Sequence, residues 1–507
     1  MAATPLDHQP VITPEQLQSV RETRKSPGRL KTEVLAGLVV ALALIPEAIA
    51  FSIIAGVDPR IGLFASFTMA VTIAFVGGRP AMISAATGAI ALVIAPLVAS
   101  HGVDYFVAAV VLAGVFQVIL GVSGVARLMR FIPRSVMVGF VNALAILIFM
   151  SQVPELLGVP LLVYPLVVLG LVIVFGLPKI TRAVPAPLVV IVVLTAITVF
   201  AALAIPTVGD KGELPSSLPG LFIPNVPLTL ETLQIIFPFA LAMAFVGLLE
   251  SLMTAKLVDD VTDTRSHKTR EAWGQGVANI VTGFTGGMGG CAMIGQTMIN
   301  VKASGARTRI STFLAGVFLL ILVVVLGGVV SVIPMAALVA VMIFVAIATF
   351  DWHSIQPSTL KRMPKSETTV MLATVIVTVA THNLAIGVVV GVVVAMVAFA
   401  RRVAHFVTVD RTEETINGDR HATYTVNGEL FFASSNDLYT QFDYATDPHQ
   451  VTIDLHGSHL WDASTIAALD AITEKYRTHG TDVAIVGLNE ASTMMRERLG
   501  RKLGAGH

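Results

Sequence analysis

Apolar runs long enough to cross a lipid bilayer fill most of this chain, from Val34 to Arg402. A membrane-spanning helix needs about 20 predominantly apolar residues, and many such runs follow one another here with short polar stretches between them. The full chain of 507 residues is 55% hydrophobic and 13% charged, with a mean hydropathy of +0.80. This composition excludes a soluble globular protein and predicts a polytopic, mainly α-helical membrane protein.

The charge balance and the cysteine count exclude several other classes. The formal net charge is zero, which argues against a general affinity for nucleic acid. A single cysteine, Cys291, rules out an internal disulfide and a cysteine-based metal cluster. The sequence has no nucleophile–base pattern and no phosphate-binding loop, so we expect no enzymatic activity, no metal and no cofactor. No apolar run precedes Val34, so we expect no cleavable signal peptide.

The apolar region divides into fourteen candidate spanning segments, several of them short. With the N-terminus in the cytoplasm, fourteen crossings place most loop Lys and Arg residues on the cytoplasmic side and leave only Arg60 and Lys211 outside. This segregation follows the positive-inside rule. We therefore expect a multi-pass cell-membrane protein with both termini in the cytoplasm. The segments are 34–55, 61–77, 87–99, 104–124, 132–152, 161–177, 187–206, 233–257, 270–285, 291–301, 308–330, 334–350, 367–381 and 384–400.

Both ends of the chain differ in composition from the apolar region. We expect a cytoplasmic N-terminal tail over 1–31, a membrane domain over 32–402 and a small cytoplasmic α/β domain over 403–507, where charged and apolar residues alternate. In this last domain the pattern predicts strands at 422–426, 428–432, 451–455 and 483–486, and helices at 436–444, 463–477 and 491–503.

The membrane domain contains an internal repeat. Gly88 follows Glu47 by 41 residues, and Cys291 follows Glu250 by the same 41 residues, each at the head of a short segment. Because each copy has seven segments, an odd number, the second copy must be inverted in the membrane. A 7+7 inverted repeat with short, glycine-interrupted helices at matching positions is typical of a secondary transporter whose site lies near the midplane.

The glycine-rich stretch 283–290 must break the chain at membrane depth. It holds five glycines in eight residues, and each glycine costs a helix about 1 kcal/mol relative to alanine. Non-helical backbone is tolerated there only where protein covers it or where it lines a cavity. We expect a short helix to restart after Gly290 and to direct its free N–H groups and positive dipole end inward, which would favour an anion.

Small residues mark the start of both short helices. They let backbone N–H groups approach an anion, and a threonine at the first site adds a hydroxyl donor. The alternative is that small residues only allow close helix packing, but two matching patches favour a binding role. Neither patch contains Lys or Arg, so dipoles and hydrogen bonds would hold the anion. The candidate residues are Thr87, Gly88, Ala89 and Ile90 in the third segment, and Ile294, Gly295, Gln296 and Thr297 in the tenth.

Two acidic residues lie within apolar segments, where ionisable groups usually have a function. Burial and a neighbouring anion would both favour a neutral Glu250, so its protonation would accompany anion binding, as proton symport requires. The alternative is a core glutamate bonded to the backbone. Glu47, which follows Pro46, could line the cavity or share a proton with Glu250, or it could serve a helix break or an interface.

Several stretches together resemble the sulfate permease (SulP) family of anion transporters. They are 43–51 and 56–64 in the first two segments, Ile132-Pro133 with 138–140 and Gln152 in the fifth, and the C-terminal module, which looks like a STAS domain. The resemblance implies a core domain of segments 1–4 and 8–11 that moves against a gate domain of segments 5–7 and 12–14. The anion would sit between the third and tenth half-helices.

The resemblance also suggests roles for individual residues. The family's coupling residue falls on Glu250, and we assign Thr254, four residues later, to the same ion-coupling site. Sodium-coupled bicarbonate members carry Asp in place of Glu250 and Thr in place of Ile294, which disfavours sodium coupling here. Phe51 matches an aromatic that contacts substrate in relatives, although a role in the apolar core is equally open.

The leading interpretation is a proton-coupled transporter or an exchanger of small anions. Members of this family are often homodimers, and we expect a homodimer here. Sulfate is the first choice, and bicarbonate or a dicarboxylate stays open. The alternatives are a sodium-coupled bicarbonate symporter, an anion exchanger, a nucleobase permease of the same architecture, and an anion channel or STAS-linked sensor.

Two polar clusters have simpler explanations than a site. In anti-sigma antagonists with the STAS fold a serine corresponding to Ser464 accepts phosphate, but here Asp462 or Ser464 better fits a helix N-cap. A regulatory partner at this domain stays open. Asp259, Asp260, Asp263 and Arg265 fit a solvated helix end better than a metal site.

Overall fold

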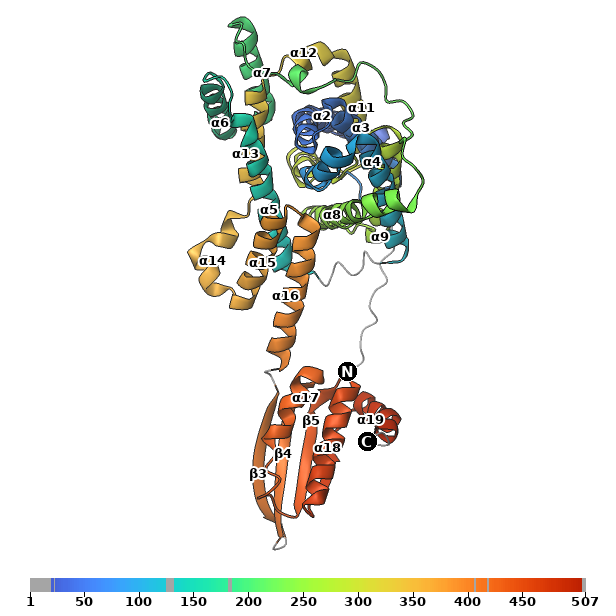
Figure 1. Cartoon of the computed structure of the whole chain (residues 1–507), viewed down its shortest axis with the longest axis vertical. Coiled ribbons are helices and arrows are strands. Elements are labelled where there is room, and N and C mark those ends of the chain that lie inside the picture. The colour runs from blue at the N-terminus through green and yellow to red at the C-terminus, as the bar shows by residue number, and fades with distance from the viewer. Residues whose placement is uncertain are drawn as a thin grey trace. The chain divides into compact units, whose positions relative to one another are not determined.

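The structure is a computed structural model that describes residues 20–21, 23–124, 132–180, 185–404, 407–416 and 419–503. Residues 1–19 and 22 of the predicted N-terminal tail lie outside this set. The chain divides into two compact units after Val392, within helix α16 (Leu384–Ala404) (Figure 1). The predicted domain boundary after Arg402 falls in the same helix. Each unit is described by itself.

Helix is present in each of the fourteen predicted segments of the first unit. Seven helices of the described chain are long and apolar enough to span a membrane: α2, α3, α4, α5 with its continuation, α6, α8 and α16. The helices are α2 (Pro27–Ala55), α3 (Pro59–Val76), α4 (Gly88–Val122), α5 (Arg134–Gln152), α6 (Val163–Ile180), α7 (Ala186–Phe200), α8 (Leu230–Thr262), α9 (Lys268–Phe284), α10 (Ile294–Met298), α11 (Arg309–Val325), α12 (Gly327–Ser331), α13 (Met335–Thr349), α14 (Pro357–Arg362) and α15 (Lys365–Thr381).

Helix α4 contains both the third and the fourth predicted segments. They are joined at Gly102, whose φ of +80° and ψ of −173° are not helical. A positive φ of this size is costly for any residue with a Cβ. The chain therefore kinks between the two segments at a residue suited to the bend.

The packing of the first unit confirms the inverted repeat. The contact of α2 with α11 has its counterpart in α8 with α4, and the contact of α3 with α11 has its counterpart in α9 with α4. Figure 1 shows α2, α3, α4, α8, α9 and α11 in one group, and α5, α6, α7, α13 and α15 in another. Movement of one group against the other stays a prediction.

The second unit is a four-stranded sheet with helices. The strand order is β3-β4-β5-β6, in which β3 (Thr408–Ile416) runs antiparallel to β4 (Asp419–Leu430), while β5 (Gln450–Leu460) and β6 (Asp482–Val486) continue in parallel. The helices are α17 (Phe432–Leu438), α18 (Ala463–Thr478) and α19 (Glu490–Leu503). The fold is the predicted α/β type.

Three details of this unit differ from the predicted pattern. The edge strand β3 was not expected, because its many charged residues hide the alternation; charge is common on sheet edges. The segment expected at 422–426 and the first three residues of the one expected at 428–432 belong to the single strand β4, which ends at Leu430 and has an irregular register between Thr425 and Asn427. Helix α17 begins at Phe432, four residues before the predicted start.

The predicted N-cap at the start of α18 is confirmed for Asp462. One oxygen of its carboxylate accepts a hydrogen bond from the backbone N–H of Thr465 at 3.0 Å. The other accepts from the backbone N–H of Phe432 at 2.6 Å. Asp462 therefore holds the starts of α17 and α18 together.

Candidate functional site

Two short strands bring the heads of the two half-helices to one place. Strand β1 (Ser84–Ala85) pairs antiparallel with β2 (Cys291–Ala292), so that Ser84 faces Ala292 and Ala85 faces Cys291. Helix α4 begins at Gly88, as predicted, and α10 begins at Ile294. Helix does not restart directly after Gly290, because Cys291 and Ala292 are engaged in this sheet, which pairs their backbone groups at membrane depth.

The pairing of β1 with β2, at the heads of α4 and α10, is called the crossing below. The glycine-rich stretch makes it possible. Helix α9 ends at Phe284, which confirms the predicted break. Gly286 and Gly289 have φ values of +72° and +70°, where glycine is favoured. A Cβ placed on Gly290 would lie 1.9 Å from the carbonyl oxygen of Ala85. Any side chain at 290 would therefore push the two strands apart.

Asn279 on α9 fixes the residue that precedes β2. Its carboxamide oxygen accepts the Gly290 N–H at 2.8 Å, and its Nδ2 donates to the Gly290 carbonyl at 3.0 Å and to Oε1 of Gln117 at 2.8 Å. Sequence reasoning missed Asn279 and Gln117. The available signal was two amides within apolar segments, where unpaired polar groups are costly.

Glu250 on α8 reaches this crossing through Cys291. The carboxylate is buried, with 7% of the residue exposed. It accepts a hydrogen bond from Cys291 Sγ at 2.9 Å, and the same Sγ lies 3.1 Å from the hydroxyl of Thr87, the N-cap residue of α4. Thr87, Cys291 and Glu250 thus form a continuous chain of contacts between the two repeats. Sequence reasoning gave Cys291 no such role.

Glu47 on α2 contacts the other side of the tenth segment. Its Oε1 accepts a hydrogen bond from Nε2 of Gln296, and both residues are buried. Among the described contacts, Glu47 and Glu250 have different partners, and nothing joins them directly. The structure therefore places both acids at the broken tenth segment, each with its own hydrogen-bond partner.

The remaining predicted residues differ in what they contact. A Cβ on Gly88 would lie 2.9 Å from a ring carbon of Phe51, so this ring covers the first turn of α4. Gly295 is exposed, and a Cβ there would meet no atom within 4 Å. Ala89, Ile90 and Thr87 are buried.

Two predicted threonines have hydrogen bonds with backbone groups. Thr254 donates to the main-chain carbonyl of Glu250 at 2.8 Å and not to its carboxylate. The Thr297 hydroxyl accepts from the Ile83 N–H at 3.0 Å. Both contacts support the frame around the crossing.

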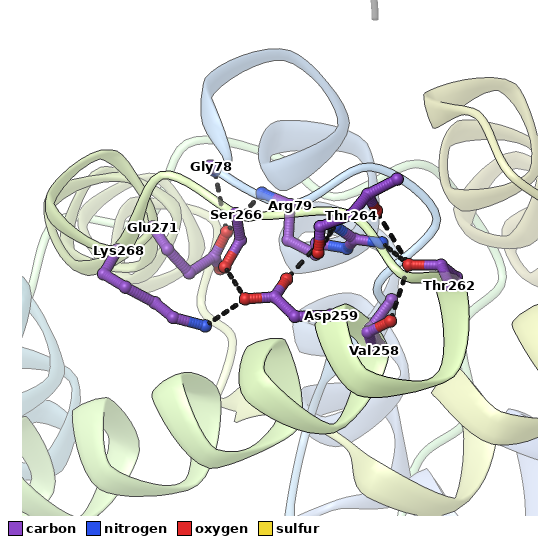
Figure 2. Close-up of polar contacts among 9 residues, drawn as sticks. All are labelled: Gly78, Arg79, Val258, Asp259, Thr262, Thr264, Ser266, Lys268 and Glu271. Carbon is purple, nitrogen blue, oxygen red and sulfur yellow. Dashed lines mark hydrogen bonds and ion pairs between the residues drawn. The ribbon is translucent and has the colours of Figure 1, made fainter. Parts of the chain in front are cut away.

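A polar network holds the loop that leads into β1 (Figure 2). Glu271 accepts the N–H groups of Gly78 at 2.7 Å and Arg79 at 3.0 Å. Asp259 pairs with Arg79 at 3.1 Å and with Lys268 at 2.8 Å. The expectation of a merely solvated helix end is therefore wrong for Asp259, whose side chain is only 16% exposed. The network fixes the approach to the first half-helix.

Comparison with known sequences identifies the family. The sequence profile of the sulfate permease family matches residues 30–166 and 160–374, and that of the STAS domain matches residues 413–502. A Bacillus subtilis (strain 168) protein named "Putative sulfate transporter YbaR" is 53% identical over 472 residues, which cover 93% of this chain and 97% of YbaR. The chain belongs to the sulfate permease family, whose members are membrane transporters and not enzymes.

Two solved structures share the fold. The transmembrane domain of a cyanobacterium bicarbonate transporter, BicA, has a TM-score of 0.62 at 24% identity and covers 72% of this chain and 98% of its own. The murine Slc26a9 anion transporter in the inward-facing state has a TM-score of 0.78 at 18% identity, covering 92% and 87%. At these identities the likeness concerns the fold alone, and for BicA it concerns only the helical membrane domain.

Proposed function

We propose that this protein is a secondary active transporter of a small anion, held between the heads of α4 and α10 and coupled to a proton on Glu250. One observation carries the proposal. The crossing of β1 and β2 places the N-cap residue of α4, Thr87, and the buried Glu250 against the same side chain, Cys291. A group that binds a proton and a helix end that favours an anion are thereby linked.

The helix ends provide the anion-binding groups. No side-chain cap bonds the first N–H groups of α4 or of α10 in the described part of the chain. Uncapped N–H groups and the positive end of the helix dipole favour negative charge. We assign substrate contact to the first turns of the two helices and to Phe51, which covers Gly88. Glu47 would border the same site through Gln296.

Glu250 would supply the coupling. A buried carboxylate beside a bound anion is stabilised in its neutral form, because burial and the second negative charge both disfavour ionisation. Binding of the anion and of a proton would therefore promote each other. Ile294, in place of the threonine of sodium-coupled relatives, supports a proton over sodium as the coupling ion.

Sulfate is our first choice of substrate, because the relative with 53% identity is named for sulfate. Bicarbonate, for which BicA is named, and dicarboxylates are the further candidates. The first turns of α4 and α10 carry no Lys or Arg, so a doubly charged anion would rely on protonated carboxyls nearby.

We further propose a cell-membrane location with both termini in the cytoplasm. Arg60 pairs with Glu213 at the Pro59 end of α3, whereas Arg309 donates to the Ala74 carbonyl at the opposite, Val76 end, which Arg79 follows in the chain. Such segregation of loop cations supports the orientation inferred from the positive-inside rule. A homodimer, and a regulatory partner at the STAS domain, are proposed from the family resemblance.

Uptake into proteoliposomes tests the proposal. Radiolabelled sulfate, bicarbonate and succinate are offered at several pH values, with an inward proton gradient. We expect at least one anion to accumulate above equilibrium in the wild type. Glu250→Gln should abolish this accumulation, a loss of about tenfold or more, while exchange at equal pH continues, because the amide cannot carry a transferable proton.

Glu231→Gln is the matched control, since Glu231 is an exposed acid on the same helix α8. It should leave accumulation unchanged. Accumulation by Glu250→Gln at the wild-type level would refute the coupling assignment. Failure of all three anions to enter would refute the substrate assignment.

A further inference from the structure

The contact chain through Cys291 has a property that depends on which group donates each hydrogen. Cys291 is fully buried, and its Sγ lies 2.9 Å from Glu250 Oε2 and 3.1 Å from Thr87 Oγ1. A thiol has one hydrogen to donate and a sulfur that can accept, and a hydroxyl can do both. The positions of these three side chains therefore do not decide which group donates and which accepts in each hydrogen bond.

The backbone around the thiol is held firmly. Cys291 faces Ala85 in the two-stranded sheet, and Asn279 bonds both the N–H and the carbonyl of the preceding Gly290. Thr87 begins a helix whose fourth N–H, that of Ala91, donates to its carbonyl at 2.9 Å. The three side chains can thus change hydrogen direction by rotation alone, without movement of the backbone.

The charge of Glu250 selects the direction. An ionised carboxylate can only accept, so the thiol donates to it, and the Thr87 hydroxyl then donates to the sulfur. A protonated Glu250 can donate its own hydrogen to the sulfur. The thiol then donates to Thr87 Oγ1, which leaves the hydroxyl hydrogen of Thr87 free for another acceptor.

We propose that Cys291 is a positioning residue that relays the protonation of Glu250 to the Thr87 hydroxyl, so that Thr87 donates to the anion only when Glu250 carries a proton. The inference rests on the proposed function and deepens it. The one proton taken up comes from water and forms the O–H bond of Glu250. No other covalent bond changes, because the hydrogens of Cys291 and Thr87 only rotate.

Other ionisable groups do not interfere with the relay. Helix α8 packs against α4, α9, β2 and α10. In the described residues, Cys291 is the ionisable group with a hydrogen bond to the Glu250 carboxylate. The others on these elements and on α2 are exposed or have contacts elsewhere: Glu231, Lys256, Asp259 and Asp260 on α8, His101, Asp104 and Tyr105 on α4, Lys268, Arg270 and Glu271 on α9, and Arg29, Lys31, Glu33 and Glu47 on α2.

The test measures the half-saturating sulfate concentration for exchange, with the same pH on both sides of the proteoliposome, at acidic and at alkaline pH. If sulfate proves not to be carried, bicarbonate or succinate replaces it as the probe. The wild type should bind the probe about tenfold more tightly at acidic pH. This factor is about what one hydrogen bond to a charged group contributes, here the bond from Thr87 to the anion. Cys291→Ala should lose most of this pH dependence, because the relay is cut and only the direct repulsion between the Glu250 charge and the anion remains.

Two conservative variants separate a relay from mere packing. Cys291→Ser should keep the pH dependence, since a hydroxyl both donates and accepts. Thr87→Val should bind weakly at every pH and lose most of the pH dependence, whereas Thr87→Ser should behave like the wild type. These two Thr87 variants carry the test if Cys291→Ala does not fold.

Specific outcomes would overturn the relay. A wild-type pH profile in Cys291→Ala or in Thr87→Val would do so, and so would a flat profile in Cys291→Ser. A wild type whose affinity for a carried anion does not change with pH refutes the relay and the coupling through Glu250 together. Proton-driven accumulation in the wild type, combined with a wild-type pH profile in Cys291→Ala, refutes the relay alone. A wild type that carries none of the three anions refutes the proposed function instead, so the two failures are distinguishable.

Discussion

The two inverted repeats build the same crossing from different side chains. In the first repeat β1 leads into α4, a long helix whose first part runs to the kink at Gly102. In the second, β2 leads into the five-residue α10, followed by a π-helix, η4 (Ile299–Ala303). Glu47 and Glu250 occupy matching places in the sequence, yet their donors are Gln296 and Cys291. Both donors belong to the second repeat's broken segment.

This asymmetry shows what duplication preserves. The backbone pattern of strand, helix and acid is kept in both copies, because the crossing needs it. The hydrogen-bond donors to the two acids differ, and both donors lie in the tenth segment. Substitutions in the second repeat, at or around the tenth segment, should therefore have larger consequences than changes that support the strand of the first repeat. Three experiments examine the side chains and glycines on which the pairing of β1 with β2 and the two acids depend.

The largest effect is expected at Gly290. Gly290→Ala would force a Cβ to within 1.9 Å of the Ala85 carbonyl oxygen, so β1 and β2 must separate. We expect a loss of about 4 kcal/mol in the free energy of unfolding, or no folded protein, since overpacking against backbone cannot relax. Thermal unfolding in detergent measures it.

Gly295→Ala is the matched control, because a Cβ there meets no atom within 4 Å. It should leave the melting temperature almost unchanged. Equal destabilisation by the two substitutions would contradict the view that the crossing, and not the first turn of α10, is the crowded point.

The sequence predicted the break in the chain at 283–290 and the start of α4 at Gly88, because glycine runs and repeat spacing are local signals. It did not reveal β1 and β2, since two residues per strand are too few for an alternating pattern. The partners Cys291 for Glu250 and Asn279 for Gly290 also escaped, because each pair is close only after folding. One of the two salt bridges of Asp259 is formed with Arg79, which lies 180 residues away in the chain.

A smaller effect is expected where side chains hold the two strands. Asn279→Leu removes the partner of both the N–H and the carbonyl of buried Gly290. We expect a loss of about 3 kcal/mol, because each unsatisfied buried group costs about 1–3 kcal/mol. Ser66→Ala, in the first repeat, removes one acceptor that lies 3.3 Å from the Ala86 N–H, and should cost about 1 kcal/mol.

Unfolding of the two variants, under one set of detergent conditions, gives the comparison. If Ser66→Ala proves as destabilising as Asn279→Leu, the two repeats hold their strands equally well, and the asymmetry is confined to the acids.

The smallest effect is expected at the contact between Glu47 and Gln296. Gln296→Ala leaves the buried Glu47 carboxylate without its donor, which should cost about 1–2 kcal/mol. Glu47→Gln in the same background should recover part of this loss, because an unpaired neutral amide is less costly to bury than a carboxylate. A double-mutant cycle on melting temperatures measures the interaction energy.

Strict additivity of the two changes would mean that the acid does not depend on Gln296. Only Glu250 would then be stabilised by a hydrogen bond from the tenth segment.

The pairing of β1 with β2 also bears on how the protein is made. Residues 84 and 85 reach the bilayer about 200 residues before their partners at 291 and 292 are synthesised. Until then their peptide groups lack the strand that will bond them, a state that hydrocarbon does not tolerate. Until the later half of the chain is synthesised, the peptide groups of residues 84 and 85 must therefore be hydrogen-bonded by water or by another protein, such as the insertion machinery. The packing of the first half is completed only when the second half is present.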